Sequence, residues 1–203
     1  MSGRRKIICL GKITLLTTAL ILGAIYAYSV NHETTAETCE IITLSAEPSN
    51  YLEVNWIRRY NPSLSEADAN DLYNHIQNTI KKYHADPSYQ KGVTKQVTPR
   101  LFLSLILRES GFRWSAISDH GAIGLCQVMP LHLEDLEKAG IGTDLLDAKV
   151  NIEAGVHILM GYAKGVDSIT RALSRYNGGY KREKAGRGYA RAVLKLYGEM
   201  GGG

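Results

Sequence analysis

Residues 98–130 read TPRLFLSLILRESGFRWSAISDHGAIGLCQVMP, and the opening part of this stretch decides the fold. Thr98 is a favourable N-cap and Pro99 a favourable first helical residue, so a helix is expected to begin there. Apolar side chains then cover almost every face of this helix: Leu101, Phe102, Leu103, Leu105, Ile106 and Leu107. A helix that is apolar all round is buried at the centre of a domain. We expect it to end near residue 110, with Gly111 as a left-handed cap.

One carboxylate stands out at the end of this helix. Glu109 lies where the helix dipole disfavours negative charge, and the apolar surroundings disfavour ionisation as well. Both effects raise its pKa, as a general acid working near neutral pH requires. The alternative is that Glu109 points into solvent from the last turn and pairs with Arg108 or Arg113.

The segments outside this stretch predict further helices. Ser65 followed by Asp68 resembles a capping box, and apolar residues then recur every four positions, which predicts a helix over residues 66–83. Residues 88–97 are polar and predict a loop, whereas residues 112–126 lack periodicity and predict a loop or short hairpin. Weak helices are expected at about 131–139 and 151–164, and better-defined ones at about 167–176 and 186–198. The fold class is therefore mainly α, a helical domain around a buried central helix.

The positive charge of the chain is confined to its start. The 203 residues include 24 Lys and Arg against 20 Asp and Glu. Four cations precede the first acidic residue, Glu33: Arg4, Arg5, Lys6 and Lys12. Beyond them the charges balance, so the basic excess is typical of a targeting signal. We expect no nucleic-acid partner.

The first thirty residues have the pattern of a membrane-directed segment. Residues 13–30 carry no charge over 18 positions, and a helix of that length spans roughly 27 Å, close to a bilayer core. Ala27-Tyr28-Ser29 is also a small-x-small cleavage site. Residues 1–30 are therefore predicted to be a membrane anchor or a signal peptide. The positive-inside rule then exports everything that follows, which places the protein at the exported side of the cytoplasmic membrane, tethered by one pass or secreted.

The exported part divides into two regions. Residues 31–62 are rich in Thr, Glu, Ser, Asn and Pro and predict a linker or stalk, whose apolar island at Tyr51–Ile57 docks on the domain. Residues 63–200 form the predicted domain.

The cysteines and histidines indicate neither a metal nor a cofactor. Cys9 lies on the cytoplasmic or membrane side, whereas Cys39 and Cys126 could form a disulfide in an oxidising compartment. Cys126 sits in an apolar, glycine-rich motif, which favours a small buried thiol. No His or Cys spacing resembles a zinc site, so we expect no metal ion and no other cofactor.

The segment that begins at Glu109 strongly resembles the active-site segment of lytic transglycosylases of the soluble-lytic-transglycosylase (SLT) type, which share the lysozyme-like fold. The matching residues are Glu109, Ser110, Phe112, Ala116, Ser118, Gly121, Ala122, Gly124, Leu125, Gln127, Met129 and Pro130. Later blocks that match are Asn151, Ile152 and Gly155, then Tyr176 to Gly179, then Tyr189 with Val193. The resemblance covers about residues 65–198, and it implies a lysozyme-like fold.

The resemblance also implies a reaction with a single acid. Ordinary glycosidases need two carboxylates, whereas this motif supplies only Glu109. Glu109 would protonate the oxygen between N-acetylmuramic acid and N-acetylglucosamine. As a carboxylate it would then take a proton from the muramyl C6 hydroxyl, which closes a 1,6-anhydro ring without consuming water.

Other motif residues are expected to hold the glycan strand. The hydrogen-bonding candidates are Ser118, Gln127, Tyr176 and Asn177. Tyr189 would orient Glu109, and Met129 with Phe112 would form an apolar floor under a sugar ring. The alternatives are that Met129 and Phe112 belong to the core, and that Asn177 is present because it favours the turn conformation and not because its amide binds the substrate.

The chain departs from the family pattern at three positions: Trp114, Cys126 and Arg175. Of these, Trp114 and Arg175 are candidates to alter the sugar contacts. Residues 171–195 are strongly basic, which predicts either attraction to anionic wall groups and lipid headgroups or simply a solvated helix face.

Three functions remain open. The first is a peptidoglycan lytic transglycosylase. The second is a goose-type lysozyme-like hydrolase in which Asp119 helps to position a water molecule, and the third is a non-catalytic wall-binding or assembly module. The expected partners are peptidoglycan strands, the membrane through the N-terminal helix, and envelope-spanning machinery or virion components.

Overall fold

The computed structural model describes residues 50–201. The predicted anchor or signal segment at 1–30 and the linker up to residue 49 lie outside the described residues. Within residues 50–201, no helix combines the length and the apolar character needed to cross a bilayer.

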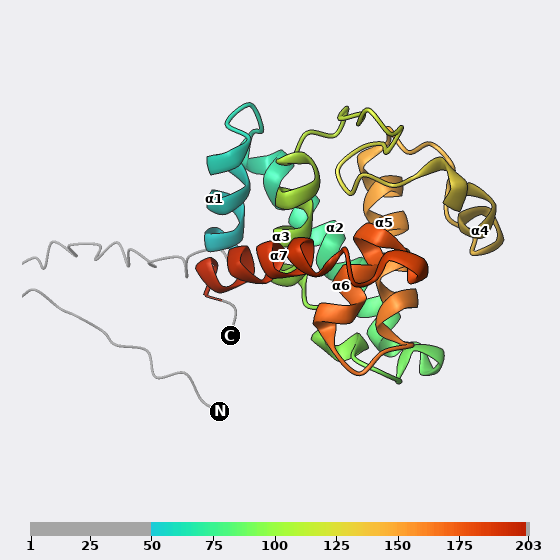
Figure 1. Ribbon diagram of the computed structural model, residues 1–203. Helices are drawn as coiled ribbons and strands as arrows, with labels where there is room; N and C mark the ends of the chain where they lie inside the picture. Colours follow the sequence, from blue (N-terminus) through green and yellow to red (C-terminus); the bar gives the residue numbers. More distant parts are fainter. Residues whose placement is uncertain (1–49, 202–203) are drawn as a thin grey trace, which may run out of the picture. The chain divides into compact units, whose positions relative to one another are not determined.

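The described part of the chain is a helical body with short 3-10 turns between the helices (Figure 1). Its α-helices are α1 (Tyr51–Tyr60), α2 (Glu66–Ala85), α3 (Pro99–Ser110), α4 (Leu133–Lys138), α5 (Ala148–Ala163), α6 (Ile169–Gly178) and α7 (Arg187–Glu199). Over residues 50–201 no named strand is present, and the loop after α3 contains only isolated β-bridges, Ile117 to Ile123 and Ile123 to Val128. The predicted mainly α fold class is confirmed.

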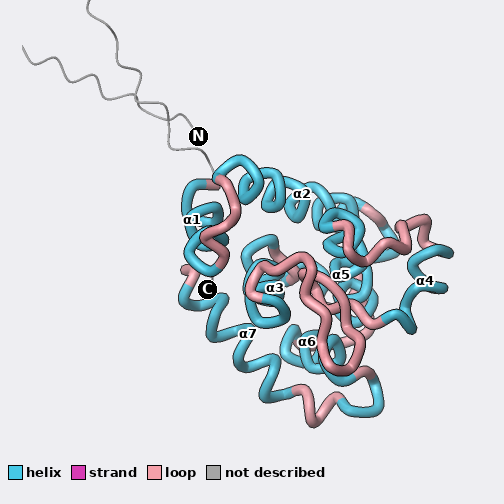
Figure 2. Tube along the Cα trace, turned by 90° about the horizontal axis from the view of Figure 1, so that it is seen from above, coloured by secondary structure: helices cyan, strands magenta, loops and turns pink. Residues whose placement is uncertain are grey.

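Helix α3 occupies the centre, as its apolar sequence predicts. The Thr98 hydroxyl accepts a hydrogen bond from the Leu101 amide at 3.2 Å, and Pro99 takes the first helical position. Gly111 caps the other end with φ of 61°, a left-handed conformation that favours glycine. Helices α1, α2, α5, α6 and α7 surround α3 when the body is seen from above (Figure 2). This arrangement buries five apolar side chains of α3 almost completely: Leu101, Phe102, Leu103, Leu105 and Ile106.

The structure differs from the predicted linker over residues 31–62, because the end of that range forms helix α1. Residues 51–60, assigned to the end of a stalk, form a helix that packs against α2 and α3. Val54 and Ile57 are buried in the core, so the apolar island does dock as expected. Arg100 of α3 also donates through Nε to the Glu53 carboxylate at 2.6 Å. The sequence pattern missed this helix because one short apolar repeat and a partner 47 residues away give little local signal.

Residues 88–97, predicted to be a loop, contain regular turns and buried side chains. Residues 87–89 and 94–96 form 3-10 turns, and Val93 and Val97 are buried. The Val93 amide donates to the Ala163 carbonyl at 2.9 Å. Gly92, with φ of 60°, permits this approach, because a Cβ there would lie 2.2 Å from the same carbonyl oxygen. This segment therefore joins α5 to the start of α3.

Candidate active site

The Glu109 side chain lies at the last turn of α3 and is half-buried. The Tyr189 hydroxyl of α7 donates a hydrogen bond to its Oε1 at 2.5 Å. No salt bridge joins Glu109 to Arg108 or Arg113 in residues 50–201. Arg113 instead donates through Nε to the Ser110 carbonyl at 2.9 Å. The alternative of a solvent-facing, ion-paired Glu109 therefore does not hold.

The surroundings of Glu109 make it an acid that titrates near neutrality. Burial disfavours the charged carboxylate and raises its pKa to about 7. The Tyr189 hydroxyl and the Arg108 guanidinium act in the opposite direction, because both stabilise the carboxylate. A group with this pKa both donates and accepts a proton near pH 7.

Tyr176 and Cys126 lie within electrostatic range of Glu109. The Tyr176 hydroxyl donates to the Cys126 carbonyl at 2.8 Å and so connects α6 to the loop after α3. Burial, reinforced by the Glu109 charge, raises the pKa of both the Tyr176 hydroxyl and the Cys126 thiol well above their usual values. Cys126 is fully buried, as predicted for a small packed thiol. Cys9 and Cys39 lie outside the described residues.

Asn151 of α5 positions the loop that carries Cys126. Its Oδ1 accepts from the Cys126 amide at 2.7 Å, and its Nδ2 donates to the Ile123 and Leu145 carbonyls at 2.9 and 2.8 Å. One turn later, Gly155 leaves room for this loop, because a Cβ there would lie 2.7 Å from Cys126. The Asn-Ile-x-x-Gly match thus has a structural reason.

Ser118 and Gln127 hold the same loop. The Ser118 hydroxyl accepts from the Ala122 amide at 3.0 Å, and the Gln127 side-chain amide donates to the Gly124 and Ala116 carbonyls at 3.0 and 3.2 Å. Gln127 also adopts φ of 49°, an unusual conformation for a residue other than glycine. In the structure, both predicted sugar-binding side chains shape the loop.

The remaining predicted residues differ in accessibility. Met129 is half-buried after this loop, and Asn177 is exposed beside Tyr176 at the end of α6. Phe112 is completely buried, so it belongs to the core and not to a sugar-facing floor. Asp119 is exposed in the loop.

Two residues that the sequence assigned to the linker lie beside Glu109. Tyr60 and Asn61 line a cavity of about 430 Å³ at the end of α3, together with residues 107–111 and Arg113. Asn61 also donates through Nδ2 to the carbonyl of residue 112 at 2.9 Å. No local pattern marks either residue, because only the packing of α1 brings them to the acid.

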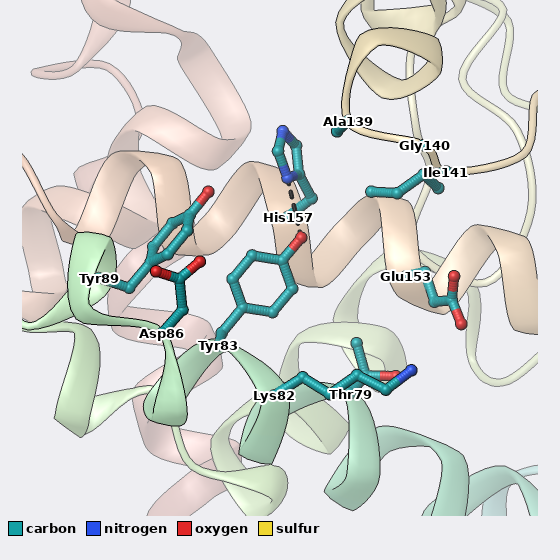
Figure 3. Close-up of a pocket in the computed structure, with 10 residues that line it drawn as sticks. All are labelled: Thr79, Lys82, Tyr83, Asp86, Tyr89, Ala139, Gly140, Ile141, Glu153 and His157. Atoms are coloured by element: carbon teal, nitrogen blue, oxygen red, sulfur yellow. Dashed lines mark hydrogen bonds between the residues drawn. The ribbon is translucent and has the colours of Figure 1, made fainter.

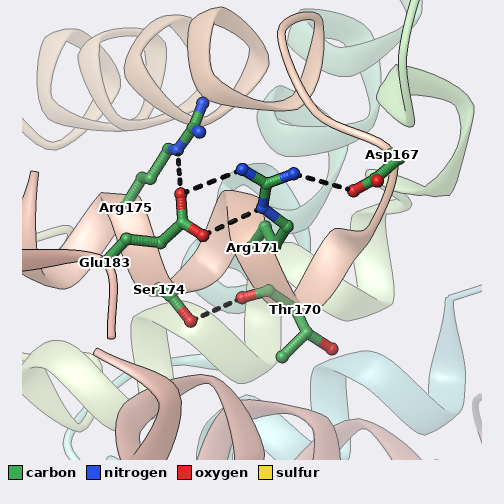
Figure 4. Close-up of polar contacts among 6 residues, drawn as sticks. All are labelled: Asp167, Thr170, Arg171, Ser174, Arg175 and Glu183. Carbon is green, nitrogen blue, oxygen red and sulfur yellow. Dashed lines mark hydrogen bonds and ion pairs between the residues drawn. The ribbon is translucent and has the colours of Figure 1, made fainter. Parts of the chain in front are cut away.

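One acidic residue, Glu183, pairs with two arginines of the basic segment 171–195 (Figure 4). One of these is Arg175, which departs from the family pattern. Glu183 accepts from Arg175 at 2.6 Å and from Arg171 at 2.9 Å. The Arg175 guanidinium also lies 4.8 Å from the centre of the Tyr180 ring. These contacts hold the connection between α6 and α7, so two of the segment's cations are paired.

A separate pocket of about 370 Å³ has walls from α2, α5 and the turn after α4 (Figure 3). The Tyr83 hydroxyl and His157 Nδ1 are hydrogen-bonded across it at 2.8 Å, and burial lowers the pKa of His157. No group of three metal-ligating side chains occurs in residues 50–201.

The family described as the transglycosylase SLT domain matches residues 86–195, which is more than half of the chain. This range contains α3 with Glu109, the loop held by Asn151, Tyr176 of α6 and Tyr189 of α7. The expectation drawn from the motifs is confirmed, and the chain belongs to the transglycosylase SLT domain family of peptidoglycan lytic transglycosylases.

Proposed function

We propose that the chain cleaves the β-1,4 bond between N-acetylmuramic acid and N-acetylglucosamine, with Glu109 as acid and then as base. The observation that carries this proposal is the half-buried Glu109, whose pKa is about 7 and whose carboxylate is held by Tyr189. Burial keeps this carboxyl protonated to a higher pH than an exposed glutamate, which suits an acid that acts near neutrality.

The proposed reaction moves one proton in each direction. Glu109 donates its proton to the glycosidic oxygen as the bond from that oxygen to the muramyl C1 breaks. The N-acetyl group of the muramyl sugar stabilises the positive charge at C1. The Glu109 carboxylate then accepts the C6 hydroxyl proton as that oxygen bonds to C1. The enzyme regains its protonated form, and the product is a 1,6-anhydro sugar.

Tyr189 supports the step in which Glu109 is charged. Its hydroxyl donates to the Glu109 carboxylate, so it stabilises the charged form that follows the first proton transfer. Tyr176, whose hydroxyl donates to the Cys126 carbonyl, and the exposed Asn177 next to it are the proposed substrate contacts of α6. Ser118, Gln127 and Met129 contribute through the loop that forms this part of the site.

The experiment that tests this function weighs the products. The full chain is incubated with purified peptidoglycan, and the released muropeptides are separated and weighed. Products lighter by one water than the hydrolytic ones are expected. Reducing-end products would instead establish a goose-type hydrolase and direct attention to Asp119. Intact wall binding without products would establish a wall-binding module.

A Tyr189→Phe substitution is expected to shift the pH dependence. Removal of the hydroxyl that stabilises the carboxylate raises the pKa of Glu109 above about 7. Because Glu109 must be protonated to begin the reaction, the decline of kcat/KM on the alkaline side moves to higher pH. The measurement is a pH–rate profile with Tyr197→Phe, on the same helix, as control. An unchanged alkaline limb in Tyr189→Phe would contradict the assigned role.

We further propose that the enzyme acts on the exported side of the cytoplasmic membrane, held there by residues 1–30 or released after their cleavage. The support is the charge-free stretch that follows the cations at the start of the sequence. Fractionation of cells that express the full chain, combined with N-terminal sequencing of the product, distinguishes the anchored from the cleaved form. A cytoplasmic, uncleaved product would contradict export.

A further inference from the structure

The cavity beside Glu109 is large enough to hold a ligand group in addition to the bond that Glu109 would protonate. Its volume of about 430 Å³ falls in the range of small-ligand pockets. We name it the arginine pocket, after two of its lining residues, Arg108 and Arg113. Tyr60 and Asn61 also line it, and both precede the segment that matches the family.

The wall that α1 contributes is fixed to α3 at both ends. Near its start, the Glu53 carboxylate is buried and paired with Arg100 at 2.6 Å. Just after its last residue, Asn61 donates to the Phe112 carbonyl at 2.9 Å. Phe112 has φ of 62°, so this bond also stabilises an unusual backbone turn directly after the acid-bearing helix. These two contacts therefore fix the position of Tyr60 and Asn61 in the lining of the pocket.

The exposed arginines at this pocket form no salt bridge within the described residues. Arg108 and Arg113 line it, and Arg59 lies 5.9 Å from the centre of the Tyr60 ring. None of these three arginines forms a salt bridge within residues 50–201, although four others do: Arg58, Arg100, Arg171 and Arg175. The bond from Arg113 Nε to the Ser110 carbonyl fixes the guanidinium and leaves its terminal amino groups for a ligand.

We infer that the arginine pocket binds a carboxylate on the muramyl side chain of the glycan strand. A guanidinium group matches a carboxylate through two parallel hydrogen bonds, and unpaired arginines beside a cavity favour an anionic ligand. The inference rests on the proposed function, because it supposes that Glu109 faces a muramyl sugar. The carboxylate comes from the stem peptide or from the lactyl group, and the volume of the pocket favours the peptide.

Occupation of the pocket also affects the acid. The Arg108 cation lowers the pKa of Glu109, so a carboxylate that binds Arg108 offsets this effect and favours the protonated acid. The other groups that face Glu109 are Tyr189 of α7, Tyr176 of α6 and Cys126 of the loop. Because kcat reports the ionisation of the enzyme–substrate complex, the alkaline limb of kcat is expected at higher pH for peptide-bearing strands than for peptide-free strands. In Arg108→Gln this difference should disappear.

Binding measured without turnover provides the direct test. The full chain carrying Glu109→Gln is titrated calorimetrically with three tetrasaccharides. One is GlcNAc–MurNAc with stem tetrapeptides, the second is the same sugar with free lactyl carboxylates, and the third is neutral chitotetraose. Adding Arg113→Ala is expected to weaken binding of the peptide-bearing probe about tenfold, the usual effect of losing a hydrogen bond to a charged group. A comparable loss for the lactyl probe would identify the lactyl carboxylate as the ligand.

A matched variant separates the pocket from the general charge of the protein. Arg191→Ala, also in the Glu109→Gln chain, removes an exposed arginine of α7 that has no salt bridge in the described residues. Its affinity for the peptide-bearing probe should stay within about twofold. An equal loss in Arg191→Ala, or an equal loss of chitotetraose binding in Arg113→Ala, would overturn the inference. Because this assay needs no catalysis, its result stands apart from whether the wild-type chain releases anhydro products.

Discussion

A Glu109→Gln substitution is expected to lower the release of anhydro-muropeptides about a thousandfold or more. General acid or base catalysis by one side chain contributes roughly 10²–10⁴-fold, and in the proposed reaction the same carboxyl performs both steps. Glutamine keeps the size of the side chain and its acceptor for the Tyr189 hydroxyl, but it has no proton to donate to the glycosidic oxygen. The measurement is the initial rate of product release from purified peptidoglycan.

The fold of this variant should be at least as stable as that of the wild type. Folding raises the pKa of Glu109 from 4.5 to about 7, so the native state favours the protonated form. This contribution to stability is complete below pH 4.5 and is lost as the pH rises through about 7. Glutamine removes the dependence, so the melting temperature of Glu109→Gln relative to wild type should rise with pH over that window.

A second glutamate substitution provides the control for activity. Glu137 is exposed in α4 and has no salt bridge within residues 50–201, so Glu137→Gln should retain wild-type activity. Retention of a tenth or more of the wild-type rate in folded Glu109→Gln would exclude Glu109 as the acid. A loss of activity accompanied by a lower melting temperature at pH 8 would point to a structural role.

An Asn151→Ala substitution is expected to cause the largest loss of stability among these variants, about 3 kcal/mol. It removes the three hydrogen bonds of the buried Asn151 side chain, to the Cys126 amide and to the Ile123 and Leu145 carbonyls. Each buried group left without a partner costs about 1 kcal/mol or more. For a domain of this size the melting temperature should fall by about 10 °C.

The same substitution should also reduce activity, because the loop it releases supplies the Cys126 carbonyl that Tyr176 contacts. Denaturant unfolding gives the free energy, and the activity assay is run well below the melting temperature. Asn78→Ala replaces an exposed asparagine of α2 and should change stability by less than about 0.5 kcal/mol. Equal stability of Asn151→Ala and Asn78→Ala would show that the loop does not depend on Asn151.

The features that the sequence predicted correctly are those with local causes. The apolar run of α3, its cap at Thr98 and its left-handed end at Gly111 follow from periodicity and from the preferences of single residues. The same reasoning singled out Glu109 as a carboxylate in an unfavourable position. The motif around it then indicated the family, because the spacing of its matching residues is specific.

The tertiary structure decided what depends on residues far apart in the chain. It placed α1 in the body and brought Tyr60 and Asn61 to the acid. It also showed that Gln127 holds its own loop and that Arg175 pairs with Glu183. These contacts depend on how helices pack, and no periodicity or residue preference encodes them. The sequence alone therefore singled out the proposed acid and the helix that carries it, whereas the pKa and the neighbours of Glu109 follow from burial, which exists only in the folded chain.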